Sequence, residues 1–200
     1  MTEHENRVLR TFVSVPLSPT TIHTLSTFIE NLNKEGNLRI RWVKPKHFHL
    51  TLIFLPKTDP IQLYSIFNKI QQAATKFSPF PLRLNTLGGF PHINSPKVLW
   101  ASVLGEVTKL ELLHNKINSK LVPLGFLQER QKIVPHITLG RVPSSATQDA
   151  TLLLKQVITA NFNFPAEDWC VTELHYIEST LTQIGPVYKT IGIAPLSKVL

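Results

Sequence analysis

The chain has 200 residues, a formal net charge of +8 at pH 7 and an isoelectric point near 9.7. This length suits one domain of ordinary size, in which folding buries most of the apolar surface of the unfolded chain. The single cysteine, Cys170, excludes an intrachain disulfide, and the lack of a cysteine cluster excludes the common structural zinc sites.

The excess of basic residues favours an anionic partner such as RNA, and a basic protein that binds no polyanion is the alternative. The first ten residues, MTEHENRVLR, are polar, and no run of 18 apolar residues occurs. We therefore expect a cytoplasmic protein that has no membrane span.

The elements in chain order begin with a strand and a helix. Residues 8–17 form a β-branched and aromatic run that is stopped by Pro16, which predicts a strand. Ser18 suits an N-cap and Pro19 the first helical position, and apolar residues at helical spacing follow as far as Gly36. The segment after Ser18 is therefore predicted to be an amphipathic helix that stops at Gly36.

The rest of the chain alternates between extended and helical patterns. Further strands are predicted at residues 40–43, 48–55, 81–90, 97–104, 132–142, 169–181 and 186–193. Further helices are predicted from Asp59 to about Phe77, over residues 106–121 and over residues 144–160. Some neighbouring strands look like hairpins, and strict βαβ spacing is missing. We therefore predict an α+β fold with largely antiparallel sheets.

A four-residue pattern occurs twice, as HLTL at residues 49–52 and as HITL at residues 136–139. A shift of 136 − 49 = 87 residues also places the helix that begins at Asp59 on Ala146, within the start of the fourth predicted helix. The order of elements thus repeats in one register, as an internal duplication would leave it. We predict a bilobal fold, with two lobes related by a pseudo-two-fold axis around a central cleft, in a single domain over residues 1–200.

Each repeated pattern places a histidine and a threonine on one face of a strand. Alternate side chains share a face, so His49 and Thr51 point to one side and the neighbouring leucines to the other. The same parity holds for His136 and Thr138. A lone strand histidine is more often structural than catalytic, but core packing gives no reason to repeat two polar residues on one face. The duplication therefore predicts two imidazoles and two hydroxyls in one cleft.

This set of groups suits in-line displacement at phosphorus. A neutral histidine can accept a proton from the attacking water while a protonated one gives a proton to the departing alkoxide. The ordinary imidazole pKa near neutrality suits both tasks. The hydroxyls of Thr51 and Thr138 can donate to the non-bridging oxygens, where negative charge is held. The scheme requires no metal, and it leaves open which histidine is the acid and which is the base.

Two further residues near the patterns carry alternatives. Arg141 lies five residues after His136, so strict alternation places it on the opposite face unless a bulge turns it toward the cleft. There it would bind a phosphate, and otherwise it is a solvated charge at a strand end. His47 shares the face of His49 and could chelate a metal with His136, but no Asp, Glu or Cys lies beside either strand, so no metal site is predicted. Base stacking or, more simply, core packing is expected of the strand aromatics Phe12, Trp100 and Tyr188.

Five separated blocks together resemble the RNA 2',3'-cyclic phosphodiesterases of the 2H phosphoesterase superfamily, also known as 2'-5' RNA ligases. The blocks are RTFVSVPL, RWVKPKHFHLTLIFL, GGFPHINSPKVLWASV, PHITLGR and ELHYIESTLTQIGPVYKTI, and they extend from about residue 8 to residue 191. The resemblance implies a bilobal α+β fold with a central cleft. It also implies hydrolysis of RNA-terminal 2',3'-cyclic phosphates to 2'-phosphates without a metal or cofactor, and some capacity to form 2'-5' linkages.

The resemblance assigns roles to particular residues. It makes His49, Thr51, His136 and Thr138 the catalytic set and matches Arg141 to an arginine after the second motif, so that the threonines and Arg141 would bind the substrate. The sequence departs from the family at Ile53 and Pro56, where lysine and glycine are common. We expect a monomer that acts on RNA. The alternatives are a related enzyme for a small cyclic nucleotide or 2'-5' oligoadenylate, and a non-catalytic RNA-binding protein.

Overall fold

The computed structural model describes residues 8–35, 40–127, 132–143, 148–160, 164–165, 167–183 and 185–197. Its strands are β1 (Leu9–Pro16), β2 (Arg41–Trp42), β3 (His49–Thr58), β4 (Phe80–His92), β5 (Ser95–Gly105), β6 (His136–Arg141), β7 (Asp168–Val171), β8 (Glu173–Thr182) and β9 (Gly185–Pro195). Its α-helices are α1 (Pro19–Glu35), α2 (Leu63–Ala74), α3 (Val107–Leu121) and α4 (Gln148–Thr159), and short 3-10 helices lie at Pro45–His47, Pro60–Gln62 and Val122–Leu124. The predicted helix stop at Gly36 and the predicted start of the fourth helix at Ser144 lie outside the described residues.

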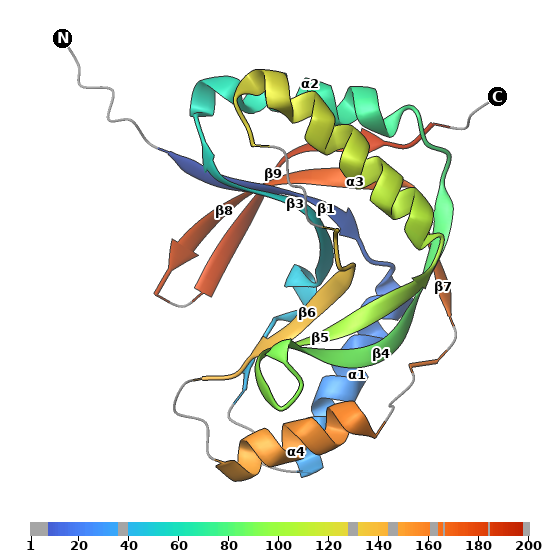
Figure 1. Cartoon of the computed structure of the whole chain (residues 1–200), viewed down its shortest axis with the longest axis vertical. Helices are drawn as coiled ribbons and strands as arrows, with labels where there is room; N and C mark the ends of the chain where they lie inside the picture. The colour runs from blue at the N-terminus through green and yellow to red at the C-terminus, as the bar shows by residue number, and fades with distance from the viewer. Residues whose placement is uncertain are drawn as a thin grey trace.

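The strands form one curled sheet in the order β7-β4-β5-β6-β3-β1-β8-β9, with β2 paired to β6 beside this path (Figure 1). The recorded pairings are antiparallel. In Figure 1, α2 and α3 lie together at one end of the molecule, whereas α1 and α4 lie at the other. The prediction of an α+β fold with antiparallel pairing is confirmed.

The two lobes are the two halves of this sheet. One half is β3-β1-β8-β9 and the other is β6-β5-β4-β7, and the recorded register between them is the single pair Leu50 and Ile137. Helices α2 and α3 pack on the first half, and α4 packs on β4 and β5 of the second. The order of strands is therefore symmetric about the junction of β3 and β6, as a pseudo-two-fold axis requires.

The duplication extends over a longer unit than the sequence pattern indicated. A shift of 87 residues carries the starts of β1 and α1 from 9 to 96 and from 19 to 106, close to the starts of β5 at 95 and α3 at 107. Each repeat thus runs strand, helix, HxTL strand, helix, strand. The last strand of each repeat, β4 or β8, pairs with the first strand of the other, β5 or β1. Neither lobe is one continuous half of the chain.

Two predicted strands differ from the observed ones. The run 169–181 divides at Thr172 into β7 and β8, because β7 pairs with β4 whereas β8 pairs with β1 on the far side of the junction. The predicted strand 132–142 begins only at His136. The apolar pattern of residues 169–181 is continuous, so it could not reveal that β7 and β8 join different halves of the sheet.

The face of β3 and β6 that carries no histidine is fully buried. Leu50, Leu52, Ile137 and Leu139 are at most 3% exposed and belong to the main hydrophobic core. Burial of each such side chain contributes about 1.5–3 kcal/mol as an upper estimate. This apolar face fixes the register and so holds the opposite, polar face toward the candidate site. Among the helices in the described ranges, none combines the length and the apolar character needed to cross a membrane.

Candidate active site

The two predicted histidine motifs lie on neighbouring strands at the junction of the two lobes. Leu50 of β3 pairs with Ile137 of β6, and both are buried. In an antiparallel pair the flanking residues follow in opposite order, so Thr51 lies on the side of His136 and the other histidine on the side of the second threonine. The four polar side chains predicted from the sequence therefore gather on one face of two adjacent strands.

The imidazole of His49 is held at both nitrogens. Its Nδ1 donates to the carbonyl oxygen of His47 at 2.7 Å, and its Nε2 lies 3.1 Å from the hydroxyl oxygen of Thr51. A carbonyl oxygen can only accept, so the proton of neutral His49 resides on Nδ1 and Nε2 accepts from the threonine. The backbone thus presents the basic nitrogen of His49 to the polar face.

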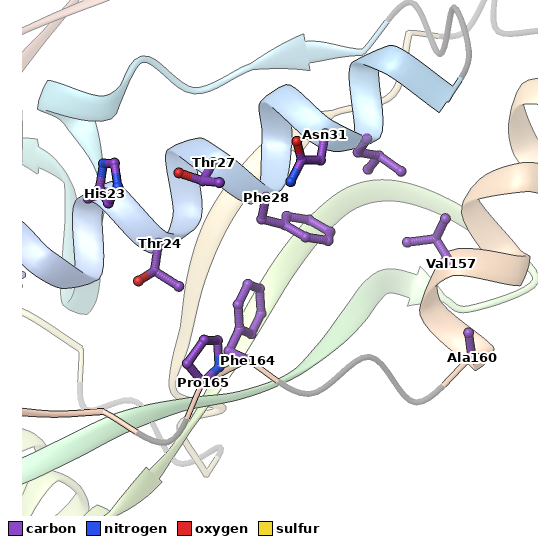
Figure 2. Close-up of a pocket in the computed structure, with 10 residues that line it drawn as sticks. His23, Thr24, Thr27, Phe28, Asn31, Val157, Ala160, Phe164 and Pro165 are labelled. Carbon is purple, nitrogen blue, oxygen red and sulfur yellow. The ribbon is translucent and has the colours of Figure 1, made fainter.

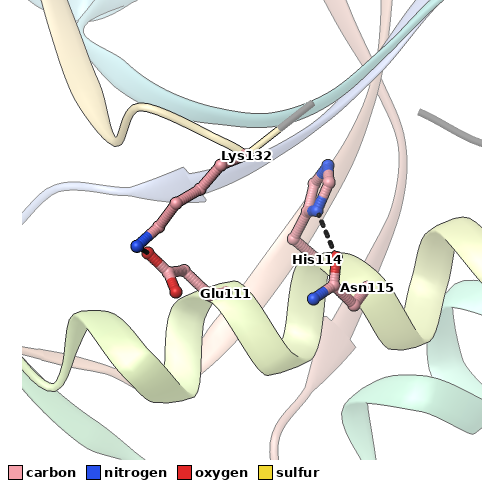
Figure 3. A network of polar contacts seen from close by, with 4 residues as sticks. All are labelled: Glu111, His114, Asn115 and Lys132. Carbon is pink, nitrogen blue, oxygen red and sulfur yellow. Dashed lines mark hydrogen bonds and ion pairs between the residues drawn. The ribbon is translucent and has the colours of Figure 1, made fainter. Parts of the chain in front are cut away.

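His136 shares the first of these two contacts, the one made by Nδ1. Its Nδ1 donates to the carbonyl oxygen of Val134 at 2.7 Å, again two residues earlier in the chain. An ion pair of 3.1 Å between Lys132 and Glu111 joins the segment before β6 to α3 (Figure 3). One turn further along α3, the imidazole of His114 forms a hydrogen bond with the side chain of Asn115. Both imidazoles therefore turn Nε2 toward the polar face by a backbone contact.

The walls around the two imidazoles differ. His49 stacks on Phe12 with ring centroids 4.8 Å apart, and the edge of Tyr188 lies at 5.7 Å. His136 packs edge-to-face with Phe90 at 5.0 Å and Trp100 at 5.9 Å. The first imidazole therefore has one stacked ring neighbour, Phe12, whereas both recorded ring neighbours of the second lie at steep angles to it.

Burial among these side chains changes the pKa of His49. Burial lowers the pKa of His49, the carbonyl of His47 raises it, and the positive charges of His47 and His136 lower it further. The charge of His136 acts on His49, so the two imidazoles lie within electrostatic range of each other. Protonation of both at once is therefore disfavoured.

Both strands bulge at equivalent positions. The register of β3 against β1 shifts at Leu52, and that of β6 against β5 shifts at Leu139, which is 52 + 87. In each strand the leucine and the residue after it, Ile53 or Gly140, are both buried. A bulge of this kind places two consecutive residues on one side and reverses the alternation beyond them.

The bulge in β6 brings Arg141 to the polar face. Strict alternation predicts the opposite face, but the two residues before Arg141 are buried and Arg141 itself is exposed, so it returns to the side of Thr138. The pKa of Tyr188 agrees with this position of Arg141. Burial raises that pKa, and the positive charges of Arg141 and Arg10 lower it, as expected if both arginines lie on the same face as Tyr188. The structure thus brings the five predicted site residues to one face.

Two further residues belong to this face: Tyr188, for which core packing was the simpler expectation and base stacking the alternative, and Arg10, which was given no site role from the sequence. The ring of Tyr188 lies 4.7 Å from that of His47 and 5.2 Å from that of Phe12, in addition to its contact with the first catalytic candidate. The guanidinium carbon of Arg10 lies 5.3 Å from the ring centroid of Phe54. Strand parity, which puts Arg10 on the face of Phe12, was a signal for Arg10, whereas no pattern indicated that β9 brings Tyr188 to this site.

The described residues contain no group of three or more His, Cys, Asp or Glu side chains arranged to hold a metal ion. A separate pocket of about 600 Å³ lies between α1 and α4 (Figure 2). It is lined by His23, Thr24, Thr27, Phe28, Asn31, Leu32, Val157, Ala160, Phe164 and Pro165. None of the five predicted site residues lines this pocket, so it is distinct from the candidate active site.

Comparisons with known proteins identify the family of the chain. The family model described as the 2'-5' RNA ligase superfamily matches residues 25–182. The RNA 2',3'-cyclic phosphodiesterase of Aquifex aeolicus (strain VF5) is 31% identical over 188 residues, which cover 92% of this chain and 96% of that protein. The enzyme of the same name from Thermotoga maritima is 30% identical over 183 residues, which cover 92% of this chain and 93% of its own.

Solved structures share the fold. A protein of Thermus thermophilus superposes with a TM-score of 0.78 at 24% identity, covering 96% of this chain and 100% of its own. The E. coli LigT protein in complex with NADP+ superposes with a TM-score of 0.75 at 19% identity, covering 96% of this chain and 99% of its own. The family model matches most of the chain, and relatives 30% and 31% identical match nearly its whole length. The chain therefore belongs to the 2'-5' RNA ligase superfamily.

Proposed function

We propose that this protein is an enzyme that hydrolyses 2',3'-cyclic phosphates at RNA ends to 2'-phosphates, with His49 and His136 as its acid–base pair. The observation that carries the proposal is the matched tether of the two imidazoles, each held through Nδ1 by the carbonyl oxygen two residues earlier. Two oriented Nε2 atoms on adjacent strands suit a reaction in which one proton is removed and another is supplied. The names of the relatives support the same activity.

The proposed reaction is a single in-line displacement at phosphorus. The oxygen of a water molecule forms a bond to phosphorus while the bond from phosphorus to O3' breaks. One imidazole accepts the proton of the water and the other protonates O3', which leaves a 2'-phosphate and a free 3'-hydroxyl. When the phosphate binds, the hydroxyl of Thr51 turns its proton from Nε2 of His49 to a non-bridging oxygen, which frees Nε2 for proton transfer. The hydroxyl of Thr138 and the guanidinium of Arg141 also bind the non-bridging oxygens, where charge develops.

The same geometry allows a second outcome at the same phosphorus. If a 5'-hydroxyl of another RNA strand takes the position of the water, its oxygen bonds to phosphorus while O3' leaves. The product is then a 2'-5' phosphodiester, and the two proton transfers are unchanged. We propose this ligation as a side capacity of the site, because it needs no further catalytic group.

The charges around the site favour an RNA end over a small nucleotide. Arg10, Arg141, Lys44 and Lys46 lie on or beside the polar face, and no carboxylate in the described ranges forms an ion pair with any of them. Uncompensated cations attract a polyanion and raise its local concentration. A small cyclic nucleotide or 2'-5' oligoadenylate remains the alternative substrate, and RNA binding without catalysis remains the alternative function.

Product analysis tests the proposal. The protein is incubated with an oligoribonucleotide that ends in a 2',3'-cyclic phosphate, with and without excess EDTA, and the products are separated. We expect a 2'-phosphate end at equal rates in both samples, because the scheme assigns charge stabilisation to hydroxyls and a guanidinium. Loss of activity with EDTA and its return with one added metal would instead support a metallohydrolase that uses His47. An intact cyclic end in both samples would support RNA binding alone.

A further inference from the structure

Arg10 occupies a defined place beside the candidate active site. Alternation along β1 puts Arg10, Phe12 and Ser14 on one face, and Phe12 is the residue on which His49 stacks. Arg10 is exposed, and its guanidinium carbon lies 5.3 Å from the ring centroid of Phe54. A guanidinium that stacks on a ring keeps the N–H groups in its plane available for hydrogen bonds.

The ring under Arg10 reaches this face through the bulge in β3. Phe54 follows the two buried residues of the bulge, pairs with Phe12 across the strands and is 40% exposed. A shift of 54 + 87 = 141 makes Phe54 the counterpart of Arg141. Each lobe therefore presents a guanidinium at the position that follows its bulge. In one lobe this is the side chain of Arg141, and in the other it is Arg10, which stacks on Phe54.

The ring of Tyr188 lies beside the rings that position Arg10. It contacts Phe12, and Phe12 pairs across the strands with Phe54, on which the guanidinium of Arg10 stacks. The charges of Arg141 and Arg10 lower the pKa of Tyr188 against the larger effect of burial, which agrees with this placement. The ring of Tyr188 in turn contacts His49. Among the described carboxylates, none pairs with Arg10. An exposed guanidinium that lies on an aromatic ring and has no ion-pair partner among the described residues is suited to an anionic oxygen of a ligand.

We propose that Arg10, together with the hydroxyl of Tyr188, binds the phosphodiester next to the terminal cyclic phosphate and so selects an RNA strand over a cyclic mononucleotide. This inference rests on the proposed function, in which Arg141 binds the reacting phosphate. A nucleoside 2',3'-cyclic phosphate has no second phosphate, so Arg10 has no partner on it. The effect of Arg10 therefore depends on the substrate, unlike that of a group that acts on the reacting phosphorus.

Three substrates separate these effects. They are a nucleoside 2',3'-cyclic phosphate, the same nucleotide with an added 5'-phosphate, and a short oligoribonucleotide with the same cyclic end. The second carries the additional anion without any further base. The variants are Arg10→Gln, Phe54→Leu, which removes the ring under the guanidinium, and Lys116→Gln, which removes one exposed charge from α3 as a matched control.

In the wild type, kcat/KM should be about 10-fold or more higher for the two substrates with a second phosphate, as for a charge-assisted contact. Arg10→Gln should remove most of that preference, Phe54→Leu part of it, and Lys116→Gln none. Binding of an oligonucleotide 2'-phosphate should also lose about 0.7 of its slope of log affinity against log salt in Arg10→Gln, the value for one contact to a single strand.

Two results would overturn the inference and leave the proposed function intact. One is an active wild type without preference for the second phosphate. The other is an equal loss on all three substrates in Arg10→Gln, with folding checked by circular dichroism, because that would place Arg10 in the chemistry or in the fold. A wild type inactive on every substrate would instead overturn the proposed function, and the inference with it.

Discussion

Strands β3 and β6 have the same backbone arrangement, but the aromatic side chains that surround their histidines differ. Each begins at its histidine, tethers Nδ1 to the carbonyl two residues earlier and bulges at the leucine after its threonine. His49 is stacked on Phe12, whereas His136 packs in T-shaped contacts with Phe90 and Trp100. The duplicated backbone fixes the position of two similar groups, and the walls set their access to solvent. Burial lowers the pKa of His49, so this wall favours the neutral imidazole that a general base requires.

The largest expected effect comes from removing either imidazole. A positioned acid or base contributes about 10²- to 10⁴-fold, so His49→Ala and His136→Ala should each lower turnover of an RNA-terminal cyclic phosphate within that range. Thr51→Ala and Thr138→Ala should retain more activity, because each removes one of several donors to the phosphate. Rates of cleavage at saturating substrate measure this. A threonine variant more impaired than both histidine variants would break the assigned division of roles.

The bulges differ in the space around their second residue. A Cβ atom added at Gly140 would lie 2.5 Å from Cγ2 of Ile40 and 2.9 Å from Cε3 of Trp42, whereas the counterpart of Gly140 in β3, Ile53, carries a full side chain. Gly140→Ala should therefore lower the free energy of unfolding by about 1–3 kcal/mol through overpacking. Urea unfolding of the variant beside Ile53→Val, for which about 0.5–1.5 kcal/mol is expected, checks this. A free energy of unfolding equal to that of the wild type would show that Ile40 and Trp42 move to accommodate the added methyl group without loss of stability.

The difference between the walls can be tested through the pKa of His49. Burial lowers this pKa, so Tyr188→Leu, which admits water, should raise it toward its ordinary value. A higher pKa means a larger protonated fraction at any pH just below neutrality, so the limb of the kcat/KM profile that reports His49 should move to higher pH. This is the acid limb if His49 is the base and the alkaline limb if it is the acid. NMR titration of the imidazole measures the shift, with Phe90→Leu at the other wall as the control. An equal rise in both variants would show that the Tyr188 ring has no specific effect.

The smallest expected effect concerns the tether of the segment before β6. The ion pair of Lys132 with Glu111 joins this segment to α3, but the side chain of Lys132 is 78% exposed. Exposed pairs of this kind contribute about 0.2–1 kcal/mol, so Lys132→Ala should change the free energy of unfolding by no more than that. Turnover should stay near the wild-type value, because the carbonyl of Val134 still orients the imidazole. A large loss of turnover would make the ion pair part of the orienting contact.

Strand parity and the repeated motif predicted that the four polar residues share one face, because parity acts over neighbouring positions and the HxTL motif recurs 87 residues later. Parity alone failed for Arg141, since the sequence LGR does not reveal the bulge that returns it to the polar face. For Tyr188 the sequence could not decide between base stacking and core packing, because its contact with His49 depends on how β9 lies against β8 and β1, which no local pattern encodes. The division of residues 169–181 into two strands was missed for the same reason. Local periodicity predicted which side chains share a face of a strand. Which strands pair with which depends instead on contacts between segments that are far apart in the sequence.

The most direct test of the central claim is a double-mutant cycle on turnover of an oligoribonucleotide that ends in a 2',3'-cyclic phosphate. The four proteins are the wild type, His49→Ala, His136→Ala and the double variant, each checked for folding by circular dichroism. If the two imidazoles act in one displacement, the double variant should be impaired little more than the worse single variant, because either loss removes their joint contribution. Near-wild-type turnover in either folded single variant, or a double loss equal to the product of the single losses, would contradict the two-histidine mechanism.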